Sequence, residues 1–259
     1  MTAHLKIHPI PILKDNYVWT LINTEKNTAV IVDPGEGLPV HQFLQQHQLI
    51  LKSILITHHH WDHTHGIMDL KKWHDPLVFG PANENIPGLT YPLHDQQPVI
   101  IENFPVMFNT MAIPGHTLGH IAYYGDDMLF CGDTLFAAGC GRIFEGTAEE
   151  MYSSLQKIAR LPETTQIYCA HEYTLNNLRF AQIVEPNNPA IIERLQQVHQ
   201  IRNKNLPSLP STLAEEKTTN PFLRCDSSEL IQQVENHTGQ SLKNPIAVFA
   251  SLRKWKDQF

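Results

Sequence analysis

The segment THHHWDHTHG, residues 57–66, decides how the rest of the chain is interpreted. Five of its ten residues are histidine and one is aspartate. It begins where LKSILIT (51–57) ends, and a short, nearly continuous apolar run of this kind is typical of a buried strand. Two interpretations are open: a metal site at a strand end, or a polar loop that is rich in histidine by chance.

The spacing within this segment favours the metal site. Its alternating donors form the pattern H-x-H-x-D-H: His58, His60, Asp62 and His63. Neutral imidazole nitrogen and carboxylate oxygen suit zinc and related divalent ions. Four donors within six residues crowd a single tetrahedral ion, whereas two adjacent ions relieve that crowding.

Further along the chain come three more candidate donors. Each lies at an expected strand end or in the loop just after it: His116 in IPGHTLGH, Asp133 in LFCGDTLF and His171 in IYCAHEYT. Loops on a rigid sheet often carry functional residues, so we expect these side chains to converge on the histidine segment. The expected division places His58, His60 and His116 on one ion and Asp62, His63 and His171 on the other, with Asp133 as the bridge.

The other histidines need a separate judgement, because the chain contains sixteen and chance clusters are more common than usual. His59 and His65 lie off the alternation, and we expect neither to bind metal. His120 either orients a metal ligand through its second ring nitrogen or is structural. The ordered series of motifs after H-x-H-x-D-H argues against a chance cluster.

The pattern of elements predicts two domains. Strands are expected at 17–23 and 28–33, joined as a hairpin, and helices at 40–47, 65–74 and 148–161. After residue 173 the patterns are helical, at 175–184, 190–204, 227–238 and 244–256, and only a short segment at 220–224 could be extended. We therefore expect a sheet-rich domain over 1–173 and a helical domain over 174–259.

Composition limits the classes of function. The 259 residues carry a net charge of −7, which argues against a nucleic-acid partner because phosphate binding needs clustered Lys and Arg. No apolar run is long enough to predict a membrane span or a signal peptide. The four cysteines, Cys131, Cys140, Cys169 and Cys225, form no C-x-x-C pair and are expected as free thiols. We expect a cytoplasmic monomer.

The metal motifs resemble those of the metallo-β-lactamase superfamily. That resemblance implies an α+β fold, an αββα sandwich with a binuclear metal centre at one edge, followed here by a smaller helical domain. The order of motifs is most similar to the glyoxalase II (hydroxyacylglutathione hydrolase) branch. The matching motifs cover nearly the whole chain: LKDNYVW, VDPGE, THHHWDHTHG, PGHTLGH, CGDTLF, GCGRIFEGT, AHEYTLNN and the terminal KDQF.

The resemblance implies a thioester hydrolase that acts on S-D-lactoylglutathione in the removal of methylglyoxal, releasing glutathione and D-lactate. A hydroxide that bridges two divalent ions would attack the carbonyl, and Asp62 is the expected catalytic residue because it binds one ion and orients the hydroxide. An alkyl thiol has a pKa of about 8.5, so a thiolate departs without a strong general acid. Zinc is the expected metal, with iron and manganese as alternatives that the same donors suit.

The last helix offers positive charge for an anionic substrate. Arg253 and Lys256 are three residues apart and are neighbours on a helix surface, although basic residues also favour helix C-termini for the dipole alone. In glyoxalase II this pair contacts the glycine carboxylate of glutathione. The resemblance also assigns substrate contacts to Arg142, where some members carry Lys, to Tyr173, and to Phe144, where some members have Tyr and a hydroxyl is therefore lost.

Competing interpretations remain open. Another hydrolase of this fold, a lactonase or a β-lactamase, could use the same centre, whereas the net charge disfavours a nuclease. His60 stands where redox di-iron relatives carry Glu, which favours hydrolysis. Cys131 and Cys140 lie near the proposed site but have no evident base partner. A non-catalytic protein stabilised by its ions is the alternative of a different class, although structural zinc sites are usually closed and rich in cysteine.

Overall fold

The computed structural model describes residues 4–259, and their packing forms two compact units. The first unit comprises the chain up to Ala112 together with Thr117–Gly132, and the second comprises Ile113–His116 and Asp133–Phe259. These units are defined by which residues pack together. The expected domains, 1–173 and 174–259, were defined by the change from strand patterns to helix patterns in the sequence. The domain boundary at residue 173 stays a prediction.

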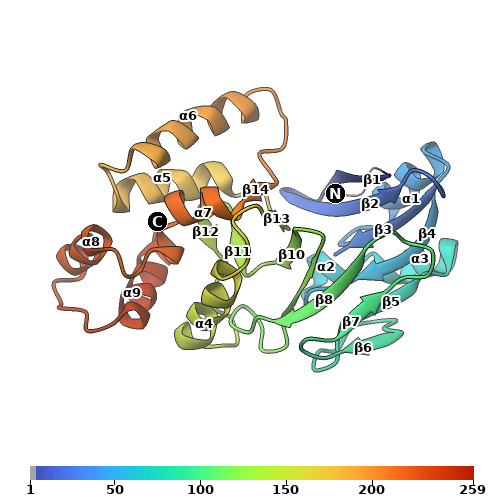
Figure 1. Ribbon diagram of the computed structural model, residues 1–259, viewed down its shortest axis with the longest axis horizontal. Coiled ribbons are helices and arrows are strands. Elements are labelled where there is room, and N and C mark those ends of the chain that lie inside the picture. Colours follow the sequence, from blue (N-terminus) through green and yellow to red (C-terminus); the bar gives the residue numbers. More distant parts are fainter. Residues whose placement is uncertain (1–3) are drawn as a thin grey trace. The chain divides into compact units, whose positions relative to one another are not determined.

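A mixed sheet forms the framework of the first unit (Figure 1). Its strands lie in sequence order: β1 (Leu5–Ile12), β2 (Asn16–Asn23), β3 (Thr28–Val32), β4 (Ile50–Leu55), β5 (Leu77–Pro81) and β6 (Tyr91–Leu93). The expected hairpin is confirmed, because β2 and β3 pair antiparallel with Asn23 opposite Thr28. From β3 to β6 the neighbours are parallel, so crossover segments must connect them.

Those crossovers include helices that cover the sheet. They are α1 (Gly37–Gln46), the short α2 (Trp61–Thr64) and α3 (Ile67–His74). Val40 and Leu44 of α1 and Leu70 of α3 join the same buried cluster as the strand residues Ile31 and Ile54. Each such side chain contributes about 1.5–3 kcal/mol when fully buried, which fixes the helices against the strands and hence the loop between β4 and α2.

A second group of strands in the first unit is antiparallel: β7 (Pro98–Ile100), β8 (Met107–Ala112), β9 (Ile121–Gly125) and β10 (Met128–Gly132). The two-residue turn Asp126–Asp127 has φ values of 50° and 59°, the geometry that a tight hairpin requires. Tyr123 of β9 donates its hydroxyl to the Ile56 carbonyl at 2.8 Å. That buried hydrogen bond links the second group of strands to the end of β4.

The second unit is mostly helical. Its elements are β11 (Leu135–Phe136), β12 (Gly139–Cys140), α4 (Ala148–Ala159), β13 (Gln166–Cys169), α5 (Thr174–Val184), α6 (Pro189–Arg202), β14 (Ser211–Thr212), α7 (Leu213–Thr219), η1 (Pro221–Leu223), α8 (Ser228–Thr238) and α9 (Pro245–Asp257). Thr147 begins α4 with a capping box, exchanging hydrogen bonds with Glu150. Among residues 4–259, no helix is long and apolar enough to cross a membrane.

Several elements differ from the sequence-based expectation, among them β14 and α7, which were not expected. The segment 220–224, which could have been extended, forms the 3₁₀ helix η1, because the Asn220 side chain accepts the Phe222 amide at 3.1 Å and starts a turn. The strand β1 was not expected, and it contains Pro9 and Pro11. Both prolines are tolerated because β1 is an edge strand that pairs only with β2.

We expect Asn220→Ala to destabilise the second unit by roughly 2–4 kcal/mol, because buried polar groups lose their partners. The buried Asn220 amide donates to the Phe136 carbonyl (3.1 Å), the Gly139 carbonyl (2.9 Å) and the Glu216 carboxylate (3.0 Å). Asn188→Ala is the control at a more exposed site: it removes a helix cap on Ala190 and a hydrogen bond to the Thr218 carbonyl, and it should cost about 1–2 kcal/mol. Urea midpoints followed by fluorescence measure both; equal shifts would contradict the expectation.

Candidate functional site

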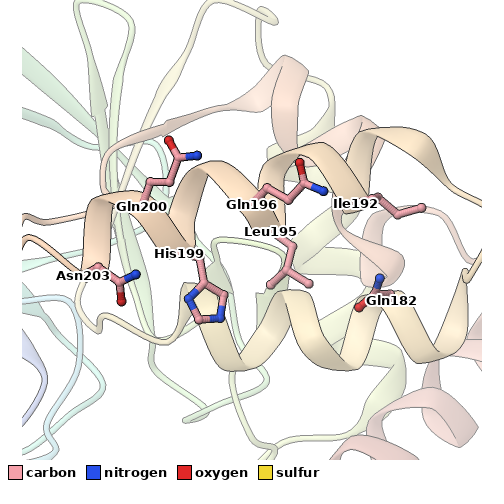
Figure 2. A pocket seen from close by; sticks show the side chains of 7 residues that line it. All are labelled: Gln182, Ile192, Leu195, Gln196, His199, Gln200 and Asn203. Atoms are coloured by element: carbon pink, nitrogen blue, oxygen red, sulfur yellow. The ribbon is translucent and has the colours of Figure 1, made fainter.

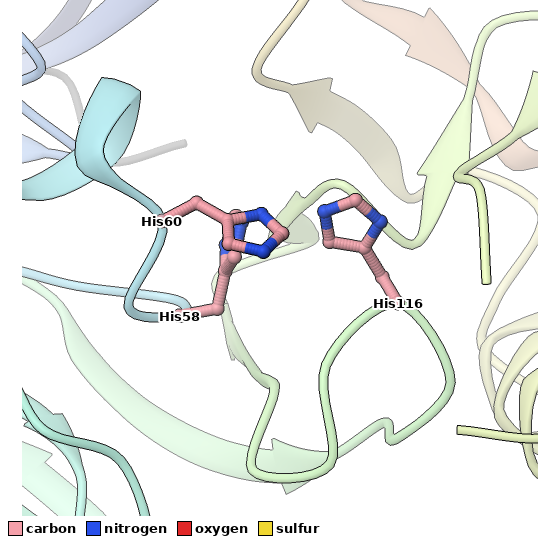
Figure 3. A group of neighbouring side chains, drawn as sticks. All are labelled: His58, His60 and His116. Atoms are coloured by element: carbon pink, nitrogen blue, oxygen red, sulfur yellow. The ribbon is translucent and has the colours of Figure 1, made fainter. Parts of the chain in front are cut away.

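The first unit carries one group of metal-type donors on the loop after β4 and on α2. His58 Nε2 lies 3.1 Å from His60 Nδ1, and Figure 3 shows both side chains projecting from this loop. Asp62 and His63 follow on α2, with Asp62 Oδ2 3.4 Å from His63 Nε2. The loop thus brings its four alternating donors together in two close pairs.

A buried carboxylate that sequence reasoning missed supports this group. Asp33 Oδ1 accepts the Thr57 amide at 2.8 Å, and Oδ2 accepts the Thr57 hydroxyl at 2.7 Å. Asp33 Oδ2 also lies 3.1 Å from His63 Nδ1, so that nitrogen carries the proton and Nε2 carries the lone pair. This is the arrangement in which an outer carboxylate fixes the tautomer and direction of a metal-binding imidazole.

Two more side chains steady the same donors. Asn16 donates from Nδ2 to Asp62 Oδ2 at 3.0 Å. The fully buried His120 stacks on His58, with ring centroids 4.6 Å apart and planes 16° from parallel. Gly132 allows this stacking: its φ is +48°, and an added Cβ would lie 2.9 Å from the His120 ring. His120 therefore contacts a candidate donor by its ring face.

The second unit carries the remaining donors around Asp133. Asp133 Oδ2 lies 3.5 Å from His116 Nε2, and Asp133 Oδ1 lies 3.4 Å from His171 Nε2. His116 projects from the loop after β8 (Figure 3), and its Nδ1 donates to the Arg142 carbonyl at 2.7 Å. The two oxygens of one carboxylate thus face two different imidazoles, as a bridging ligand requires.

The spacing of the donor atoms fits divalent metal ions. In a tetrahedral site with bonds of about 2.0–2.1 Å, neighbouring donors are about 3.3 Å apart. Four donor pairs, two in each unit, are separated by 3.1, 3.4, 3.4 and 3.5 Å. The donors are imidazole and carboxylate, the set that suits zinc, iron and manganese.

A cavity of about 440 Å³ lies within the second unit and brings donors and candidate substrate contacts together. Its walls include every residue for which the sequence predicts a substrate contact: Arg142, Phe144, Tyr173, Arg253 and Lys256. His116 and Asp133 line the same cavity, together with Phe136, Cys140, Asn176, Asn177, Asp257 and Phe259. The cationic side chains and two of the metal-type donors therefore face one space.

Asp257, another residue that sequence reasoning missed, holds the arginines of this cavity. Arg253 is only 6% exposed and donates from Nη1 to the Cys140 carbonyl at 2.7 Å. Its Nη2 lies 3.1 Å from Asp257 Oδ1, which also lies 3.7 Å from Arg142 Nε. The signal was present in the terminal KDQF, because residues 253 and 257 are four apart on a helix and are neighbours.

Lys256 is held differently from the arginines. Its ammonium lies over the rings of Phe180 and Phe259, 5.1 and 4.7 Å from their centroids. Burial and, to a smaller extent, the nearby Arg253 guanidinium lower the pKa of Lys256 to about 8. An anion that enters the cavity would favour the charged form of this side chain.

Aromatic rings and a neutral thiol complete the cavity wall. Tyr173 stacks on His171 at 4.7 Å with planes 9° from parallel. Phe144 is 62% exposed and lies edge-on to His116, with centroids 5.2 Å apart. Burial raises the pKa of the Cys140 thiol to about 11, against the effect of Arg253, so Cys140 is a poor nucleophile at neutral pH.

A second cavity, of about 530 Å³, lies between α5 and α6 (Figure 2). It is lined by Gln182, Ile192, Leu195, Gln196, His199, Gln200 and Asn203. None of the predicted site residues lines it. Apart from the single imidazole of His199, its side chains are amides and aliphatic groups, and they include no Lys, Arg or group of metal-type donors. The cavity lined by His116 and Asp133 is therefore the better candidate site.

Comparison with protein families assigns both parts of the chain. Residues 14–171 match the model described as the metallo-β-lactamase superfamily, and residues 172–259 match that described as the hydroxyacylglutathione hydrolase C-terminus. Membership of this superfamily, together with the histidine and aspartate donors, implies bound divalent metal ions.

Curated relatives match over nearly the full length. A hydroxyacylglutathione hydrolase of Nitrosomonas eutropha is 49% identical over 255 residues, covering 98% of this chain and 99% of the relative. One of Shewanella halifaxensis is 48% identical over 257 residues, covering 98% and 100%.

Among solved structures, ETHE1 from Myxococcus xanthus superimposes with a TM-score of 0.66 at 23% identity, covering 97% of this chain and 98% of that chain. The BLEG-1 B3 metallo-β-lactamase gives a TM-score of 0.64 at 22% identity, covering 85% and 100%. These structures confirm the fold: an α+β metallo-β-lactamase fold that is followed by a helical C-terminal domain.

We expect Asp33→Ala to weaken metal binding by about 10–100-fold, because residues that orient metal ligands have effects of this size. Without the carboxylate, the His63 ring loses the acceptor that fixes its tautomer. Competition with a chelator measures the affinity. The exposed Asp69→Ala on α3 is the control and should bind metal as tightly as the parent protein; an Asp33→Ala protein with parental affinity would contradict the expectation.

Proposed function

Because the chain belongs to the hydroxyacylglutathione hydrolase family of the metallo-β-lactamase superfamily, we propose that its two donor groups form one binuclear centre. The chain is a thioester hydrolase that converts S-(2-hydroxyacyl)glutathione and water to glutathione and a 2-hydroxy acid, the reaction of methylglyoxal detoxification. One observation supports this most: a single cavity holds cationic side chains beside His116 and Asp133.

The proposed ligand assignment follows the donor chemistry. His58, His60 and His116 would hold the first ion, Asp62, His63 and His171 would hold the second, and Asp133 would contribute to both. When bound, two adjacent divalent ions lower the pKa of water toward neutrality and polarise a carbonyl oxygen. We propose two ions per chain, with zinc as the principal metal and iron or manganese as alternatives.

The protein's own groups position the reactants. Asp62 is the proposed catalytic residue, because its carboxylate, held by Asn16, can accept a hydrogen bond from the attacking water and direct it. The thiolate leaving group needs no strong acid, since thiols ionise with a pKa of about 8.5. Cys140 takes no part as a nucleophile, because its buried thiol stays protonated at neutral pH.

The substrate contacts follow the charge of the cavity. Arg253 and Lys256 would bind the glycine carboxylate of glutathione, the arginine by paired hydrogen bonds and the lysine as a point charge. Arg142 adds a more exposed positive charge. Tyr173 can donate its hydroxyl to a peptide group of the substrate. Phe144 has no hydroxyl, so it contributes ring packing and its backbone only.

The direct test is thiol release from S-D-lactoylglutathione by protein loaded with two equivalents of zinc. We expect release that falls by roughly 100-fold or more in Asp133→Ala, because loss of a bridging ligand exceeds the 10–100-fold effect of an outer residue. A simple lactone and a β-lactam serve as alternative substrates. Hydrolysis of either of these with no thiol release would overturn the proposed substrate.

We expect the KM for the glutathione thioester to rise as the pH increases through about 8, because Lys256 loses its charge there. The sign follows from binding: the carboxylate favours protonated Lys256, so affinity falls as the protonated fraction falls. A charge-assisted contact predicts a rise of up to about tenfold between pH 7 and 9.5.

The control for this pH dependence is Lys256→Arg, which keeps its charge over the whole range and should flatten the profile. Lys254→Arg, an exposed site on the same helix, should leave the parental profile intact. Initial rates at several substrate concentrations give KM at each pH. A profile that is unchanged in Lys256→Arg would rule out Lys256 as its source.

The cytoplasmic location and the monomeric state stay predictions. All four cysteines are buried and carry free thiols, which is consistent with a reducing compartment. Sedimentation of the purified protein would measure its oligomeric state.

A further inference from the structure

Glu84 is a buried acidic residue in the first unit to which the proposed chemistry gives no role. It lies in the loop between β5 and β6, and its side chain is 3% exposed. Its Oε1 accepts the Gly119 amide at 3.1 Å and, by a short hydrogen bond, the Thr117 hydroxyl. Its Oε2 lies 3.2 Å from His59 Nδ1.

A buried carboxylate such as Glu84 raises the free energy of the folded state unless its hydrogen-bond donors stay close to it. Burial raises the pKa of its carboxyl group, whereas the contacts with Thr117 and His59 lower it. A buried carboxylate is tolerated only where donors are held close to it. The packing is tight as well, because a Cβ added to Gly119 would lie 3.0 Å from Glu84 Oε1.

The neighbours of Glu84 come from the two segments that carry proposed donors or their supports. His59 lies between His58 and His60 in the chain. Gly119 precedes His120, whose ring stacks on His58, and Thr117 directly follows His116. One side chain thus joins the histidine loop to the segment 117–120, although it contacts no donor itself.

We propose that Glu84 is a positioning residue that holds the histidine loop and the segment 117–120 at a fixed separation and so sets the geometry of the metal donors. The inference rests on the proposed function, because it takes His58 and His60 as metal ligands. It predicts that Glu84 variants change metal geometry and turnover, and leave the substrate contacts of the second unit unchanged.

Two substitutions separate the hydrogen bonds from the charge. Glu84→Gln keeps an oxygen that can accept from Gly119 and Thr117 but loses the charge facing His59. Glu84→Ala removes all three contacts. Glu235→Gln is the matched control, since Glu235 also fastens a loop, accepting the Leu242 amide at 2.7 Å and the Ser241 hydroxyl at 3.2 Å, but at the end of α8.

The readouts are the visible spectrum of the Co²⁺-loaded protein, metal affinity by chelator competition, and kcat with KM. We expect Glu84→Ala to shift the Co²⁺ bands and to lower metal affinity and kcat by about 10–100-fold, as outer residues of metal sites do. KM should stay within about twofold, because the substrate contacts of the second unit are unchanged. Glu84→Gln should recover part of each loss, and Glu235→Gln should match the parent protein.

Parental Co²⁺ bands and metal affinity in folded Glu84→Ala would overturn the proposal, as would an equal spectral shift in Glu235→Gln. If Glu84→Ala does not fold, Glu84→Gln and Thr117→Val decide by the same spectrum, since each removes one contact. The Co²⁺ spectrum also separates this inference from the proposed function. A parent protein that binds two metal ions but releases no thiol would refute the thioesterase, while the spectral effect of Glu84 would still stand.

Discussion

The site depends on one constraint: lone pairs of imidazole and carboxylate groups must be held close together before any cation neutralises their repulsion. His58 and His60 present nitrogens 3.1 Å apart, and Asp133 presents oxygens 3.4 and 3.5 Å from two imidazole nitrogens. Such contacts are unfavourable unless a proton or a metal ion lies between the atoms. The scaffold must therefore supply the positioning, and the cation then gains a preformed set of ligands.

Buried hydrogen bonds behind the donors supply that positioning. Asp33 orients His63 and anchors Thr57 at the end of β4, and the Arg142 carbonyl orients His116. Each partner takes up the ring nitrogen that faces away from the proposed ion, which fixes both tautomer and direction. Glu84 acts one step further back, on the loop rather than on a donor. Rigidity of the site is thus distributed over residues that do no chemistry.

The sequence predicts the donors far better than their supports, for a physical reason. The residues of H-x-H-x-D-H are close together in the sequence, so the pattern can be recognised without knowledge of the fold. Asp33 acts through Thr57 and His63, which only the fold brings near. Asp257 has one local partner, Arg253 on the same helix, and one that only the fold brings near, Arg142. The strand β1 was missed similarly, because its prolines are acceptable only at a sheet edge.

The charge of the cavity reconciles an acidic protein with an anionic substrate. The chain carries −7 overall, yet Arg142, Arg253 and Lys256 line one cavity with Asp257 as their nearby counter-charge. Asp257 forms ion pairs with both arginines. It therefore holds them in place when no substrate is bound, and it competes with a substrate carboxylate for them. Lys256 lies over aromatic rings instead, and burial together with the nearby Arg253 guanidinium lowers its pKa, so its charged form is less favoured than that of an ordinary lysine. A substrate carboxylate gains the most binding free energy beside the cation whose charge the protein itself stabilises least. Lys256 is therefore the cation on which substrate affinity should depend most strongly.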